Sequence, residues 1–209
     1  MAMTRAYVGG ATLAITLSLG VVLAASDPKF TSTWKAPEAT GVSFVGKKVA
    51  ALVMSGDQNL RVSGEEALAR VLAARGLQTV ATYRMAPAEE LTTPERARPW
   101  FERAAIDGVV VLRPVSRDVK VTYSPTIWVS SSYSTLWGYY DYGWTGIYTE
   151  GSKRTDTTLV VETLVYSVPK DTLLWAGVST ATNPKEAQAF IKQLVDEAVK
   201  EMRKQGLVK

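Results

Sequence analysis

The chain of 209 residues contains no cysteine and no histidine. These absences exclude disulfide bonds, cysteine nucleophiles, Ser-His-Asp catalysis and zinc sites built from His or Cys. The excess of one charge over the other is also small. The chain has 24 Lys and Arg against 20 Asp and Glu, and the net charge of +4 is dispersed along the sequence. We therefore expect no nucleic-acid partner. With 46% hydrophobic and 21% charged residues, the composition is typical of one globular domain.

The N-terminus has the layout of an export signal. Arg5 is the only charge before Asp27, and residues 6–25 between them are uncharged and largely apolar. A basic residue followed by an apolar run and small residues is typical of a secretory signal peptide, so we interpret residues 1–26 as one. The alternative is an uncleaved N-terminal anchor, because the run is about long enough to cross a bilayer. Either way we expect an exported protein of the periplasm or cell envelope.

Periodicity and turn residues predict a single α/β domain over residues 47–209, after an extended lead-in at 27–46. The expected order is β-α-β-α-β, an aromatic-rich insertion at 123–150, then a β-hairpin and a C-terminal helix, with the helices packed on a mixed sheet. The strands are predicted at 49–54, 77–83, 109–112, 157–168 and 172–180, and the helices begin near Ser63, Pro94 and Pro184. The first three strands alternate with helices, which predicts that they are parallel.

The first helix and the segment before it carry two linked predictions. Ser63 and Glu66 have the S-x-x-E spacing of a capping box, which predicts that this helix begins at Ser63. Asp57 and Asn59 then lie in a connection that follows the carboxyl end of the first parallel strand, where open α/β sheets usually place ligands. They are candidate binding residues for a polar ligand. The alternative is a turn in which both side chains make local hydrogen bonds.

Four segments of the C-terminal half resemble an uncharacterised family of bacterial envelope proteins, many of them lipoproteins. They are Val161–Tyr166, Leu173–Gly177, Thr182–Pro184 and Lys204–Val208. Members of that family are similar in fold to the N-terminal domain of the translocation protein TolB. The resemblance covers roughly residues 47–209 and implies an α/β envelope domain, but it supplies no catalytic residues.

The chain departs from the lipoprotein pattern at one position. Leu23–Ser26 is similar to a lipobox in which Ser26 replaces the cysteine that would carry the lipid. A hydroxyl cannot replace that thiol, so we expect no lipid anchor through cysteine.

Two charged residues lie inside apolar strand patterns. Arg113 follows the run at 109–112, and Glu162 lies within 159–165. A charge on a strand covered on both faces is costly unless it is paired. One hypothesis is therefore that Arg113 and Glu162 form a structural ion pair across the sheet. The alternative is that each points to solvent from a half-exposed face.

The aromatic-rich segment is the strongest functional lead. Nine of the 15 Trp and Tyr residues lie between Tyr123 and Tyr148, and Asp141 is the only charge among them. In an extended chain, alternate rings of this segment would project from one face and could contact a protein, a sugar or a lipid surface. The alternative is that the segment folds back and its rings cover the protein's own sheet. The candidate binding rings are Trp128, Tyr133, Trp137, Tyr140, Tyr142, Trp144 and Tyr148.

These observations lead to three functional hypotheses. The first is a non-catalytic envelope domain that binds an envelope protein through the aromatic-rich segment. The second is an envelope glycan or small-ligand binding protein that uses the same rings, with Asp57 and Asn59. The third is an enzyme that works with carboxylates or a lysine alone, which we disfavour because no acid, base and nucleophile can be assembled. We expect no cofactor and no metal, and the sequence does not define the oligomeric state.

Overall fold

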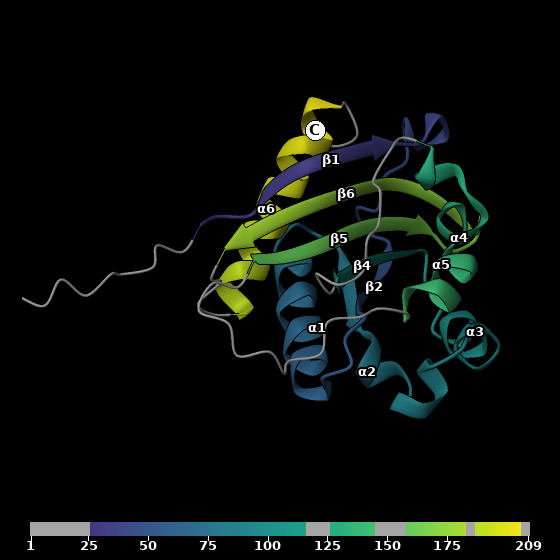
Figure 1. Ribbon diagram of the computed structural model, residues 1–209. Coiled ribbons are helices and arrows are strands. Elements are labelled where there is room, and N and C mark those ends of the chain that lie inside the picture. The colour runs from purple at the N-terminus through teal and green to yellow at the C-terminus, as the bar shows by residue number, and fades with distance from the viewer. Residues whose placement is uncertain (1–25, 116–125, 145–157, 183–186, 206–209) are drawn as a thin grey trace, which may run out of the picture.

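The computed structural model describes residues 26–115, 126–144, 158–182 and 187–205, and its centre is one six-stranded sheet (Figure 1). The sheet has the strand order β1-β6-β5-β4-β2-β3. Its strands are β1 (Lys29–Lys35), β2 (Lys48–Val53), β3 (Gln78–Ala81), β4 (Gly108–Val115), β5 (Thr158–Ser167) and β6 (Thr172–Thr182). The helices of the described residues are α1 (Gln58–Ala73), α2 (Thr82–Met85), α3 (Pro94–Arg103), α4 (Ser131–Ser134), α5 (Leu136–Gly143) and α6 (Ala187–Lys204), with short 3-10 turns η1 (Pro37–Ala39), η2 (Ala88–Leu91) and η3 (Ile127–Val129).

The sheet is mixed, as the sequence predicts. β2 pairs in parallel with β3 on one side and with β4 on the other, while β5 is antiparallel to both β4 and β6. β5 and β6 form the predicted hairpin, whose turn contains Pro169. β1 pairs antiparallel with β6 and forms one edge, so part of the lead-in belongs to the sheet.

Helices cover both faces of the sheet (Figure 1). On one face α1 and α6 pack against strand residues such as Ala51 and Leu112. On the other face α3, α4 and α5 pack against the alternate strand residues, such as Leu52 and Val111. Because successive strand side chains point to opposite faces, the near-continuous apolar runs of β2 and β4 fill both layers.

The first helix begins earlier than the capping-box pattern predicts. Asp57 is its N-cap, because one carboxylate oxygen accepts hydrogen bonds from the amides of Asn59, at 2.8 Å, and Leu60, at 3.1 Å. Ser63 lies inside α1, where its hydroxyl donates to the Leu60 carbonyl. The predicted start at Ser63 is therefore wrong, and α1 gains more than a turn at its N-terminal end.

The aromatic-rich segment is helical where it is described, so the extended conformation that a single-face stripe of rings would require is not formed. Residues 126–144 form η3, α4 and α5, and the Thr135 hydroxyl caps α5 by accepting from the Gly138 amide at 3.0 Å. Helical spacing puts Leu136, Tyr140 and Gly143 on one buried side. Tyr148 lies outside the described residues.

In the part of the chain that the structure describes, none of the helices combines the length and the apolar character needed to span a membrane.

Candidate functional site

Most of the predicted aromatic binding residues belong to the core. Trp128, Tyr133, Trp137 and Tyr140 are at most 7% exposed and pack with the α3–α5 layer on the sheet. Their rings contact one another and Phe101, mostly edge-on or tilted. These four residues present no ring surface to a partner, so their prediction as binding residues is corrected in favour of the alternative, in which the rings cover the protein's own sheet.

The aromatic core surrounds an ion pair that the sequence analysis considered. Arg113 and Glu162 occupy partner positions on β4 and β5, both side chains are fully buried, and Arg113 Nη1 lies 2.8 Å from Glu162 Oε2. Of the two alternatives from the sequence, the observed geometry is the ion pair across the sheet, and neither side chain points to solvent. Tyr139 donates to Oε2 at 2.5 Å and Tyr133 donates to Oε1 at 2.7 Å. Both carboxylate oxygens of Glu162 are therefore occupied.

This cluster holds its protons tightly. Burial raises the pKa of Tyr133 and of Tyr139, and the charge of Glu162 raises each of them further. Burial alone would lower the pKa of Arg113, but its interactions with Tyr139 and Glu162 outweigh that effect and the pKa is raised. The cluster therefore keeps protonated tyrosines and a charged arginine at neutral pH, and its chemistry is that of a structural network.

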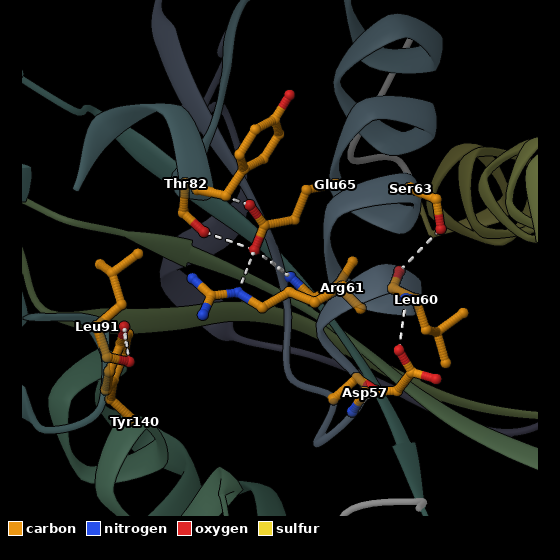
Figure 2. Close-up of polar contacts among 11 residues, drawn as sticks. Asp57, Leu60, Arg61, Ser63, Glu65, Thr82, Leu91 and Tyr140 are labelled. Atoms are coloured by element: carbon orange, nitrogen blue, oxygen red, sulfur yellow. Dashed lines mark hydrogen bonds and ion pairs between the residues drawn. The ribbon is translucent and has the colours of Figure 1, made fainter. Parts of the chain in front are cut away.

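A second buried carboxylate lies at the carboxyl ends of β2 and β3. Glu65 of α1 accepts from the Val53 amide at 3.3 Å and from the Thr82 hydroxyl at 2.6 Å, both through Oε1. Its other oxygen accepts from the Tyr83 amide at 2.7 Å. Figure 2 shows these contacts converging on Glu65 between α1 and the segment that follows β3. This side chain joins three elements at one edge of the sheet.

Arg61, one turn before Glu65, is positioned by the same carboxylate. Its Nε donates to Glu65 Oε1 at 3.1 Å, and the side chain is 4% exposed. The guanidinium projects from α1 past Glu65 toward Tyr140 (Figure 2), and it lies 5.7 Å from the ring centre of Trp144. Arg61 Nη2 is buried without a hydrogen-bond partner, and so is Trp144 Nε1.

Close packing places Trp144 at this edge. It follows the last residue of α5, Gly143, and a Cβ on Gly143 would lie only 2.4 Å from Met54 Sδ. Met54 directly follows β2, and its amide donates to the Leu112 carbonyl of β4 at 2.9 Å. The missing side chain at Gly143 thus allows the end of α5 to rest on the end of β2.

The topology makes this edge a favourable place for a ligand. From β2 the chain passes through α1 to β3 on one side, and then through α3 to β4 on the other side. In open α/β sheets, ligands bind outside the carboxyl ends of the strands where the strand order reverses in this way. We call the place where Arg61 and Trp144 meet the carboxyl-edge site.

The sequence-predicted residues contribute unequally to this site. Trp144 belongs to it. Tyr142 does not, because its ring stacks on Arg113, whose guanidinium carbon lies 5.0 Å from the centre of the Tyr142 ring. Asp57 is occupied as the cap of α1, as the turn alternative expected, and Asn59 is exposed. Sequence reasoning missed Arg61, although an Arg and a Glu four residues apart, in the segment that follows a buried strand, were a usable signal.

No cluster of three or more acidic side chains that could hold a metal ion occurs within the described ranges.

No protein-family model matches the chain, and no curated protein sequence matches it. Among solved structures it is similar to the PelC dodecamer from Paraburkholderia phytofirmans, at 15% identity and a TM-score of 0.43, over 78% of this chain and 94% of that one. It is also similar to the lipoprotein GNA1162 from Neisseria meningitidis, at 13% identity and a TM-score of 0.39, over 76% and 99% of the two chains. Likenesses this distant assign neither a role nor a site here, and the resemblance to the TolB N-terminal domain stays a prediction.

Proposed function

We propose that the protein is a non-catalytic, exported domain of the bacterial cell envelope that binds a small ligand at the carboxyl-edge site. The observation that carries the proposal is the orientation of Arg61. Glu65 fixes one edge of its guanidinium, and the group extends toward Trp144. The Arg61 side chain is only 4% exposed, yet its Nη2 has no hydrogen-bond partner. A buried donor without a partner costs about 1–3 kcal/mol, which a bound ligand would offset.

The state of the buried carboxylates supports a non-catalytic role. Both oxygens of Glu65 and both oxygens of Glu162 accept hydrogen bonds from the protein itself. A general base needs an oxygen that can reach a substrate proton. These two groups, the fully buried carboxylates of the described residues, are instead committed to holding elements together.

The envelope location rests on the sequence. The apolar run at 6–25 behind Arg5 is the predicted export signal, and Ser26 stands where a lipoprotein would carry cysteine. We therefore place the domain in the periplasm or at the cell envelope without a lipid attached through cysteine.

An envelope-protein partner remains a second hypothesis with less support. Val129 of η3 is the one large apolar side chain of the aromatic-rich segment that is strongly exposed among the described residues, at 62%. A single exposed valine is ordinary on a protein surface. Small-ligand binding is therefore the preferred function.

A thermal-shift panel tests the proposal. The purified protein and its Trp144→Phe variant are heated with glucose, N-acetylglucosamine, glucuronate or inorganic phosphate in turn. A ligand of the site raises the melting temperature of the original protein by mass action and raises that of the variant less. If every compound leaves both proteins unchanged, or stabilises them equally, the carboxyl-edge site does not bind ligands of these classes.

A further inference from the structure

We infer that the ligand group recognised at the carboxyl-edge site is an oxyanion, a carboxylate or a phosphate. The inference rests on the proposed function, since it assigns the chemical class of the ligand for that same site. Its basis is the balance between hydrogen-bond donors and acceptors among the side chains that meet there.

Both carboxylate oxygens of Glu65, which holds Arg61 in place, are already used. Glu65 Oε1 accepts from Val53, Arg61 and Thr82, and Oε2 accepts from Tyr83. Asp57 accepts from two amides in the first turn of α1. A ligand group that must donate to Glu65 would have to displace one of its four bonds.

Two hydrogen-bond donors, in contrast, are available from separate elements. Arg61 Nη2 on α1 and Trp144 Nε1 after α5 are both buried without a partner. Two unpartnered donors, one of them on a charged guanidinium, favour a group that accepts hydrogen bonds, and an oxyanion is such a group.

The arginine is suited to this role. Its Nε is bound to Glu65, so the outer edge of the planar guanidinium is held in one orientation. Charge-assisted bonds from an oriented guanidinium to a carboxylate or phosphate are among the strongest hydrogen bonds in proteins. Arg61 also lies in the first turns of the 16-residue helix α1, whose N-terminal end favours negative charge.

The competing account is that Arg61 only packs. In that case the cation–π contact with Trp144 and the bond to Glu65 are its whole function, and added anions leave it unaffected. The two accounts differ in their response to conservative substitutions. Arg61→Lys keeps the charge but removes the guanidinium fork, and Trp144→Phe keeps a ring but removes the indole donor.

Calorimetric titration separates the accounts. The purified protein is titrated with inorganic phosphate, with glucuronate and with uncharged glucose. We expect saturable binding of phosphate or glucuronate, and glucose at least about tenfold weaker. Preference for phosphate or for glucuronate identifies which source of oxyanion fits. Arg61→Lys and Trp144→Phe are each expected to weaken oxyanion binding at least about tenfold.

The matched control is Trp100→Phe. Trp100 is another half-buried tryptophan, on α3, where it contacts Arg103. This variant should bind the oxyanion as the original protein does, and circular dichroism verifies the fold of each variant. If Arg61→Lys unfolds, Trp144→Phe alone decides the question.

Three results would overturn the inference. Oxyanion binding that both site variants leave unchanged would mean that the ion binds elsewhere. Glucose binding as tightly as glucuronate, and depending on Trp144, would refute the oxyanion while the proposed ligand site stands. If none of the three probes binds, the oxyanion is also refuted, and N-acetylglucosamine in the thermal-shift panel judges the site independently.

Discussion

Arg113 Nη1 and Glu162 Oε2 lie 2.8 Å apart across two paired strands, and both side chains are fully excluded from solvent. The same carboxylate accepts the hydroxyl protons of Tyr133 and Tyr139. One ion pair in the sheet therefore fixes the helices α4 and α5 above it. Tyr133, one of the predicted binding residues, instead satisfies a buried charge together with Tyr139.

Removing one member of this pair should destabilise the protein strongly. Arg113→Met leaves Glu162 as an uncompensated buried charge, and we expect the free energy of unfolding to fall by about 3–5 kcal/mol. In the double variant with Glu162→Gln the charge is gone too, so the loss should be smaller than the sum of the single losses. Urea unfolding followed by circular dichroism measures all three. Additive losses would show that the two side chains are not coupled.

The buried tyrosines should make the protein sensitive to alkali. Burial, and then the charge of Glu162, raise the pKa of Tyr139 and of Tyr166 well above 10. Above about pH 10 the unfolded chain releases protons that the native state retains, so the free energy of unfolding falls by about 1.4 kcal/mol per pH unit for each such tyrosine. Below that pH their contribution is constant.

Tyr166→Phe provides the comparison for this pH dependence. The Tyr166 hydroxyl donates to the Tyr133 carbonyl at 2.8 Å, so the variant should lose about 1–2 kcal/mol at neutral pH. Above about pH 10 its stability should fall less steeply than that of the original protein, because one titrating group is missing. Urea unfolding at several alkaline pH values measures both slopes, and equal slopes would contradict the assignment.

Glu65 and its neighbour Glu66 offer a matched pair of substitutions. Glu65→Gln leaves Arg61 as a buried charge and weakens the junction of β2, β3 and α1, so we expect a loss of about 3–5 kcal/mol. Glu66→Gln removes the partially exposed partner of Arg84 and should cost less than about 1 kcal/mol. Equal losses in thermal unfolding would show that the Glu65 junction has no special weight.

Glycine at position 143 should be required for the approach of α5 to β2. In Gly143→Ala the new methyl group would lie 2.4 Å from Met54 Sδ, so α5 or Met54 must move, at a cost of about 1–3 kcal/mol. Gly64→Ala, inside α1, brings its Cβ only to 3.2 Å from a Val53 methyl group and gains helix propensity, so its effect should be small. A Gly143→Ala protein as stable as the original would refute the close packing.

Local signals in the sequence were sufficient for much of the fold. The apolar runs of β2 and β4, Pro94 at the first position of α3, and Pro169 in the β5–β6 turn each act within a few residues. Local chemistry decides such elements, so the sequence predicts them.

The start of α1 and the aromatic-rich segment could not be predicted in this way. Asp57 and Ser63 are both good caps, and the buried contact of Arg61 with Glu65, four residues apart, favours the longer helix. The rings around Tyr140 recur at every second residue, which fits a strand. The bond of Tyr139 to the buried Glu162 and the burial of one side of α5 favour a helix instead.

The carboxyl-edge site depends on contacts between distant parts of the chain. Arg61 is an ordinary helical arginine until α5 brings Trp144 to within 5.7 Å of it. The Trp144 ring was among the predicted binding residues, but its partner was not. The tertiary packing of Gly143 on Met54 brings the end of α5, and with it Trp144, to this edge.

The proposed ligand site is tested most directly by a nuclear magnetic resonance titration that follows the indole N–H signals of the six tryptophans. The Trp144 signal is assigned by its absence from Trp144→Phe. Trp175 serves as the internal control, since its Nε1 already donates to Gln205 at 3.2 Å. Our account predicts that glucuronate or phosphate shifts the Trp144 signal saturably and leaves the Trp175 signal in place. A Trp144 signal that stays fixed while either compound binds would contradict a ligand site at the carboxyl edge.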